Sequence, residues 1–179
     1  MRFSPRARKL ALAVHLAVSV GWVGAVAAYL SLDLVAATSD DPAFLRAAYI
    51  GMGTIAGSVI VPLAMVTVLT GLLLSLGTTW GLIRHWWVTI SLVLTVIATV
   101  VLVIEAGVIG AYAAIAADPA TTRSELRALG NTLVHSIGGG VVLLTVLVLN
   151  VYKPRGMTPY GWRKQQAERQ SRTRSTTTP

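Results

Sequence analysis

The chain has 179 residues, of which 54% are hydrophobic and only 12% are charged, and its formal net charge is +8. Soluble domains usually carry about 25% charged residues, so this balance is typical of a membrane protein and excludes an ordinary soluble domain. The sequence contains no cysteine, which excludes disulfides, thiolate metal sites and thiol redox chemistry.

Four apolar runs follow the basic start of the chain. Each has the ~20 mostly apolar residues that an α-helix needs to cross ~30 Å of hydrocarbon. Helices pair their own backbone amides, which lipid cannot do, so we expect an all-α bundle of four transmembrane helices over residues 1–162. The polar, basic segment 163–179 is predicted to be a disordered cytoplasmic tail. The runs are Leu10–Leu30, Ile50–Leu76, Trp86–Ile104 and Leu133–Val151.

The first run begins like a signal peptide, but it is longer than the ~7–15 apolar residues of a signal core. Trp22 and Tyr29 are also typical of a retained membrane segment, so we expect an uncleaved helix. His15, Ser19 and Asp33 have 3–4–7 spacing with these two aromatic residues and share one helix face with them. This polar face is expected to point into the bundle.

Proline residues mark the predicted starts and bends of the other helices. Asp41-Pro42 and Asp118-Pro119 are both typical of a helix start, with an N-cap carboxylate followed by proline. The first pair predicts one long helix from Pro42 to about Gly77, kinked at Pro62 because proline removes a backbone hydrogen bond. The second pair predicts a short amphipathic outer helix over Pro119–Leu129.

The distribution of charge predicts the orientation. Four basic residues precede the first run, one lies between the second and third, and seven follow the fourth, against three in the other segments. The positive-inside rule therefore places both termini in the cytoplasm of a multi-pass protein of the cell membrane. Acidic residues, including Asp33, are assigned to the outer loops. The basic ends predict contact with anionic lipids, and no recognition motif indicates nucleic-acid binding.

Polar residues in the third and fourth runs also share faces. Ser91, Thr95, Thr99 and Glu105 lie within about a third of the circumference of the third helix, which Glu105 is expected to close. Glu105 and His135 are predicted to form an outer polar pair that could pass protons or simply bind each other or water.

The inner level holds a second set of candidates. His15 and His85 are predicted to form an inner cluster, with Trp80, Trp86 and Trp87 as an aromatic belt at the cytoplasmic interface.

Histidines in a four-helix membrane bundle raise the hypothesis of haem b. At ~1.5 Å per residue, His15 and His135 are separated by roughly 17 Å of depth, which excludes them as axial ligands of one haem. His85 would pair with His15 only if helix tilt removed an offset of ~9 Å. A haem held by His15 alone stays open, beside a role for His15 as a hydrogen-bonded packing residue. No metal site is predicted.

Small residues predict close helix contacts, because glycines let backbones approach where lipid supplies no hydrophobic driving force. These contacts could pack the bundle itself or join copies or partners in a homo- or hetero-oligomer. The glycines are Gly53, Gly57, Gly138, Gly139 and Gly140.

Two stretches carry a resemblance to a known family. Trp80–Val88 contains the pattern Arg-His-x-Trp, and residues 152–161 read Tyr-Lys-Pro-x-Gly-x-Thr-Pro-Tyr-Gly. Both resemble an actinobacterial family of small four-helix integral membrane proteins of unknown function. The resemblance covers the chain as far as Trp162 and implies the four-helix architecture, without an activity.

A second resemblance is more distant. His15-x6-Trp22-x-Gly24, followed by Thr-Gly-Leu at 70–72, is similar to the CopD-type copper-resistance domain and the HemJ-type protoporphyrinogen oxidase. The corresponding first-helix histidine of the HemJ-type protein is taken as a haem ligand, so the resemblance implies His15, with Trp22 nearby, as a cofactor-binding candidate. The lysine that the HemJ-type pattern has at the start of the third helix is absent, since residues 89–91 are Thr-Ile-Ser.

No catalytic residues are predicted. The functional alternatives are a non-enzymatic bundle whose inward polar stripes pack the helices or serve a partner, a haem b redox protein using His15, and a small-solute or proton-coupled carrier.

Overall fold

The computed structural model describes residues 3–78 and 80–176, with side chains placed as far as Ser171. In this part of the chain, seven α-helices and one π-helical turn follow each other. They are α1 (Pro5–Thr38), α2 (Pro42–Ile55), η1 (Ala56–Ile60), α3 (Val61–Gly77), α4 (Trp86–Ala117), α5 (Arg123–Ala128), α6 (Leu133–Tyr152) and α7 (Pro159–Thr176).

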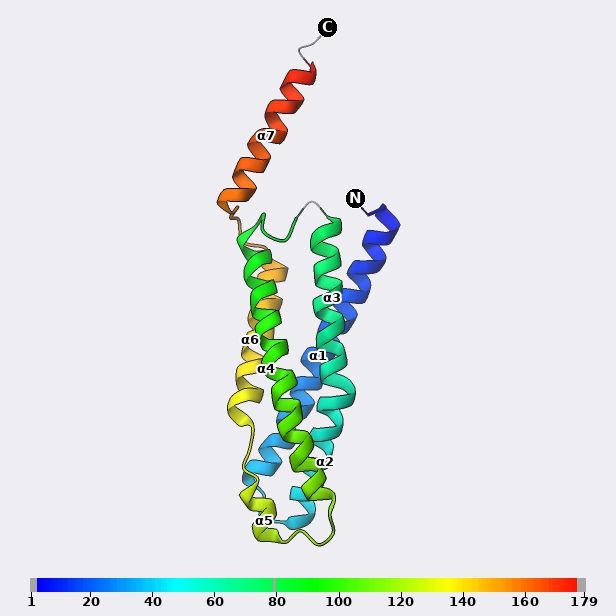
Figure 1. The fold of residues 1–179 in the computed structure, drawn as a ribbon, viewed down its shortest axis with the longest axis vertical. Coiled ribbons are helices and arrows are strands. Elements are labelled where there is room, and N and C mark those ends of the chain that lie inside the picture. The colour runs from blue at the N-terminus through cyan, green and yellow to red at the C-terminus, as the bar shows by residue number, and fades with distance from the viewer. Residues whose placement is uncertain (1–2, 79, 177–179) are drawn as a thin grey trace.

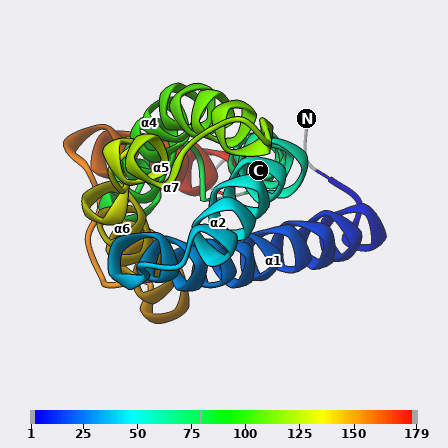
Figure 2. The same cartoon turned by 90° about the horizontal axis from the view of Figure 1, so that it is seen from below.

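Among the described residues, four helical stretches are long and apolar enough to span a membrane: α1, α2 through α3, α4 and α6. The predicted all-α architecture with four candidate spans is therefore confirmed. Figure 1 shows the stretches running side by side, with both termini at one end and α5 at the other. Figure 2 shows α1 and α4 on opposite sides, α2 between them and α6 along one flank. Helix α2 contacts both α1 and α4, and α6 contacts the same two helices. Many large apolar side chains on all four stretches are exposed. Such a large exposed apolar surface is unfavourable in water but compatible with the hydrocarbon of a membrane.

The second span is helical throughout from Pro42 to Gly77, and its geometry changes to the π-helical turn η1 just before Pro62, the residue at which a kink is predicted. Asp41 caps the span as predicted, since its carboxylate accepts a hydrogen bond from the N–H of Ala43 (2.8 Å). Pro62 has no N–H to donate and its ring crowds the preceding turn, so the helix widens into the π geometry of η1 just before it.

The core follows one stripe along this second span. Side chains three or four residues apart point inward and are almost fully buried, and they meet Trp22 and Tyr29 of α1 and Ile109 of α4. The stripe consists of Leu45, Ala48, Tyr49, Met52, Ala56, Ile60 and Ala64.

Two contacts hold α2 against α4. A Cβ added at Gly53 would lie 2.5 Å from the Cβ of Ala113, so the two backbones meet where only glycine fits. Nearer the end of α4, the guanidinium of Arg46 donates to the carbonyl oxygens of Ala116 (2.8 Å) and Asp118 (2.5 Å). These are carbonyls that the helix itself leaves unpaired at its C-terminus.

Asp33 corrects one prediction. It lies inside α1 and its exposed fraction is 0%, so it is not an outer-loop residue. Its Oδ1 accepts a hydrogen bond from the N–H of Thr132 (3.0 Å), and its Oδ2 accepts from the hydroxyls of Thr132 (2.9 Å) and Ser136 (2.8 Å). Three donors from the start of α6 replace water around this carboxylate, which is why α1 can carry it inside the bundle.

The outer helices also differ from the prediction. α4 does not close at Glu105 but continues to Ala117, and Asp118 ends it rather than starting the next helix. The short outer helix is α5, which begins four residues after Pro119 because Thr122 is its N-cap. Thr122 and Glu125 form a reciprocal capping box there, whereas the Asp118 carboxylate accepts a hydrogen bond from the N–H of Ala120 (2.8 Å) in the turn before α5.

The two stretches behind the first resemblance pack against each other at the other end of the bundle. The N–H of Thr158 donates to the carbonyl of Arg84 (3.1 Å), and its hydroxyl donates to the carbonyl of Ile83 (2.5 Å). Gly161 lies so close to the Arg84 carbonyl that a Cβ there would clash. Lys153 places its ammonium over the ring of Trp80, 5.6 Å from the centroid.

Helix α7 covers most of the segment for which composition predicts disorder. It begins at Pro159, where the Thr158 hydroxyl accepts from the N–H of Gly161 (3.1 Å), and it extends to Thr176. Glu168 forms an ion pair with Arg84 (3.2 Å), and Figure 1 shows the rest of α7 projecting away from the bundle. Gln, Arg, Lys, Ala and Glu favour a helix even where no apolar face packs.

Candidate functional site

A cavity of about 260 Å³ lies inside the bundle, between α1, η1, α4 and α6. We call it the lateral pocket. Its walls are mainly apolar side chains and small residues, among them Val26, Ile60, Leu102 and Leu143. Ala56 and Ile60, the two buried residues of η1, both line it, so the widened turn ahead of Pro62 contributes directly to the wall.

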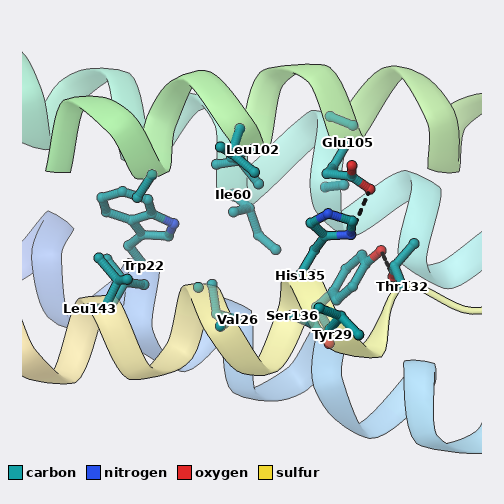
Figure 3. A pocket seen from close by; sticks show the side chains of 18 of the residues that line it. Trp22, Val26, Tyr29, Ile60, Leu102, Glu105, Thr132, His135, Ser136 and Leu143 are labelled. Atoms are coloured by element: carbon teal, nitrogen blue, oxygen red, sulfur yellow. Dashed lines mark hydrogen bonds and ion pairs between the residues drawn. The ribbon is translucent and has the colours of Figure 1, made fainter. Parts of the chain in front are cut away.

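Polar groups gather at one end of the lateral pocket. Figure 3 shows Trp22 and Leu143 at one end and the pairs Glu105–His135 and Tyr29–Thr132 at the other. The Tyr29 hydroxyl lies 2.7 Å from Thr132 Oγ1, which uses its own hydrogen for Asp33, so Tyr29 is the donor. The network around Asp33 thus fixes α1 against the start of α6 and shapes the polar end.

The pocket opens sideways between α4 and α6. Besides His135 and Gly138, three of its lining residues are exposed: Ile97 (55%) and Val101 (41%) on α4, and Val134 (81%) on α6. All three are apolar and lie on candidate membrane spans. The opening therefore faces the surroundings of the spans, which lipid would occupy, rather than either end of the bundle.

Glu105 and His135, proposed from their depth as an outer pair, are brought together at this opening. Glu105 Oε2 lies 3.5 Å from His135 Nδ1, and the two side chains are 23% and 52% exposed. A carboxylate within a membrane span is costly unless paired, and protonated histidine is its natural partner. The two side chains therefore form a polar contact at the mouth of the pocket.

Trp22 supplies the remaining polar group. Its side chain is only 3% exposed, and its indole Nε1 has no hydrogen-bond partner among the described residues. Figure 3 shows the indole nitrogen turned toward the middle of the lateral pocket. Buried tryptophan N–H groups normally find an acceptor, so this donor is unusual.

The two inner histidines have separate partners. His15 Nδ1 lies 2.8 Å from Thr70 Oγ1 at the contact between α1 and α3, and its ring packs against Gly71. His85 is the N-cap of α4, where its Nδ1 lies 3.1 Å from the carbonyl of Trp80 and its ring meets the Trp80 ring edge to face. The described residues contain no group of three or more His, Asp or Glu side chains placed to hold a metal ion.

The remaining predicted residues have packing positions. Ser91, Thr95 and Thr99 are buried, and Ser91 Oγ accepts from the side-chain amide of Asn150 on α6 (3.2 Å). Of the candidate glycines, Gly53 contacts α4 inside the bundle, whereas a Cβ at any of the others would meet nothing within 4 Å. Gly138 and Gly139 line the lateral pocket. Their use in an oligomer stays a prediction.

Comparison of the chain with models of protein families, with curated proteins and with solved structures gives no match. The functional conclusions therefore depend on the geometry of the chain itself. Sequence patterns did not predict the pocket, because its wall combines four elements that are distant in the sequence. The one signal in the sequence is a tryptophan well inside an apolar run, away from the interfaces where tryptophan is enriched.

Proposed function

We propose that the protein is a non-enzymatic, multi-pass membrane protein that binds a lipophilic molecule in the lateral pocket. The observation that carries this proposal is an apolar cavity of about 260 Å³ whose opening lies between exposed apolar residues of two candidate spans. Ligand sites are typically concave and mostly apolar, with a few convergent polar groups that fix orientation. A molecule dissolved in the bilayer reaches this opening without crossing water.

Photolabelling tests the proposal. The protein in lipid nanodiscs is illuminated with an alkyl diazirine analogue of hexadecane, and adducts are mapped by mass spectrometry. We expect adducts at Ile60, which lines the pocket and is only 2% exposed. The variant Gly139→Phe fills the pocket and should abolish them, whereas Gly110→Phe, on the exposed face of α4, should not. Adducts confined to lipid-facing residues such as Leu69 would refute binding in the pocket.

We propose further that both termini lie in the cytoplasm and that the protein resides in the cell membrane. The excess of basic residues at the end of the bundle that holds both termini supports this orientation. The chain has no native cysteine, so Ser171→Cys and Ala120→Cys report the two ends without background. In intact cells a membrane-impermeant maleimide should label only the cysteine at position 120. Labelling at position 171 alone would reverse the orientation.

Haem b binding is a second candidate, favoured by one observation. Thr70 engages His15 Nδ1, as the supporting partner of a metal-bound imidazole does, and this leaves Nε2 for a ligand. His135 cannot serve the same haem, because it lies within one turn of Thr132, which contacts Tyr29 about 21 Å along α1 from His15. A Soret band in the purified protein that is lost in His15→Ala would support haem. A colourless, folded preparation would reject it.

A proton-coupled carrier is the other candidate, and the contact between Glu105 and His135 favours it. Proton-coupled uptake into proteoliposomes should then fall in both Glu105→Gln and His135→Ala. Uptake that neither substitution changes would exclude the pair from transport.

A further inference from the structure

We propose that the ligand of the lateral pocket is a lipophilic carbonyl compound whose oxygen accepts a hydrogen bond from Trp22 Nε1. The inference deepens the proposed function and rests on it. It starts from the indole N–H, which is buried, lines the pocket and has no acceptor among the described residues. An unpaired buried donor is unfavourable, so a ligand that supplies an acceptor gains directly from pairing it.

Water is a poor partner for this donor. A buried water needs two to four polar partners to be held, and the pocket near Trp22 offers apolar side chains. Figure 3 shows Leu143 beside Trp22, with Val26, Ile60 and Leu102 between them and the polar end. Among the described residues, the other buried polar groups without a partner are the hydroxyls of Ser19 and Thr67, and neither residue lines the pocket.

A carbonyl fits the donor better than a hydroxyl does. The indole N–H donates and cannot accept, so the ligand atom has to be an acceptor. A hydroxyl would bring a hydrogen of its own, which this apolar wall would leave unpaired. A carbonyl oxygen brings no such hydrogen.

Depth favours a carbonyl that lies within the hydrocarbon layer. Trp22 is seven residues from Tyr29, hence about 10 Å deeper along α1 than the polar end of the pocket. The hydrocarbon core is about 30 Å thick, so this position is well inside it. The ring carbonyl of an isoprenoid quinone can reach that depth with its head group, whereas the ester carbonyl of a diacyl lipid normally lies at the edge of the core.

Competition for the diazirine label at Ile60 tests the inference. The competitors are hexadecane, a menaquinone with two isoprenoid units, and dioleoylglycerol, each added to wild type and to Trp22→Phe. Phenylalanine keeps an aromatic ring but has no N–H. We expect the carbonyl competitor that binds to need a roughly three- to tenfold higher concentration to halve the labelling of Ile60 in Trp22→Phe than in wild type. Hexadecane should reduce the labelling at the same concentration in both proteins.

The outcomes separate the two carbonyl sources and the two levels of the proposal. A shift for menaquinone identifies a quinone-type ligand, and a shift for dioleoylglycerol alone identifies an acyl ester. If hexadecane protects Ile60 but no competitor distinguishes the two proteins, the role of Trp22 is wrong and the pocket stands. If Ile60 is never labelled, the proposed function itself fails.

A measurement on the wild type covers the case in which Trp22→Phe does not fold. The indole N–H resonance of Trp22 should move downfield when the carbonyl competitor is added and stay unchanged with hexadecane. An indole resonance that responds to neither would overturn the inference.

Discussion

Substitution of Asp33 is expected to loosen the outer half of the bundle. The carboxylate is fully buried and accepts three hydrogen bonds, one from the backbone and two from hydroxyls. In Asp33→Asn the amide keeps one accepting oxygen and turns an NH2 group toward a donor. At least one donor of Thr132 or Ser136 then loses its partner, which costs on the order of 1–3 kcal/mol. Asp33→Ala removes all three bonds and should cost about 3–5 kcal/mol, less than three independent losses because they share one carboxylate.

Unfolding in mixed micelles measures these costs. SDS is titrated into the detergent-solubilised protein, and the free energy of unfolding is followed by far-UV circular dichroism for Asp33→Asn, Ser136→Ala and the double variant. We expect a coupling energy of about 0.5–3 kcal/mol between the two positions. Hydrogen bonds inside membrane proteins average only about 0.6 kcal/mol, so the lower part of this range is still informative. The assigned network would be refuted if both single variants had free energies of unfolding within about 0.3 kcal/mol of wild type and their effects were additive. This threshold is chosen because about 0.3 kcal/mol is the usual deviation from additivity.

Two further predictions concern packing and capping. Gly53→Ala should lower the free energy of unfolding by about 1–3 kcal/mol, because the new Cβ meets Ala113. In the control Gly57→Ala the new Cβ meets nothing within 4 Å, so the free energy of unfolding should stay nearly unchanged. Equal effects of the two substitutions in the same SDS titration would contradict the packing. Hydrogen bonds from the backbone and then the side chain of Thr122 lower the pKa of Glu125. The capping box therefore stabilises α5 above the unfolded pKa of this carboxyl group, and the stabilisation is lost as pH falls through the lowered, folded pKa. Thr122→Ala should raise the pKa of Glu125 part of the way back in a carboxyl ¹³C NMR titration, Thr122→Ser should not, and an unmoved pKa in Thr122→Ala would contradict the hydroxyl's contribution.

Length and local pattern predicted the elements whose cause is local. The four spans follow from apolar runs, and the π-helical turn before Pro62 follows from the missing N–H of that proline. Two signals for a helix start lie close together here: Asp118-Pro119, and the capping-box spacing of Thr122 and Glu125. The prediction follows the first, and the structure shows that the second begins α5.

Long-range pairing decided what the sequence could not. Charge assigns Asp33 to an outer loop, whereas spacing assigns it to the inward face of the first helix. The donors that decide between the two lie 99 and 103 residues further along the chain, and no local pattern contains them. The pocket has the same origin, since Trp22, Ile60 and Leu143 come from three different elements. Glu105 and His135 were assigned to one level from residue counts alone, because helix rise converts sequence position into depth.

Contact between lipid chains and a buried pocket residue tests the central claim most directly. The protein, deuterated except for the methyl groups of isoleucine and methionine, is placed in nanodiscs of protonated lipid, and nuclear Overhauser effects from acyl chains to these methyls are recorded. Ile60 and Met52 are both buried, at 2% and 0% exposed, but only Ile60 lines the lateral pocket. We predict acyl-chain cross-peaks at Ile60 and none at Met52. Cross-peaks at the exposed Met65 with silence at Ile60 would contradict a pocket that is open to the bilayer.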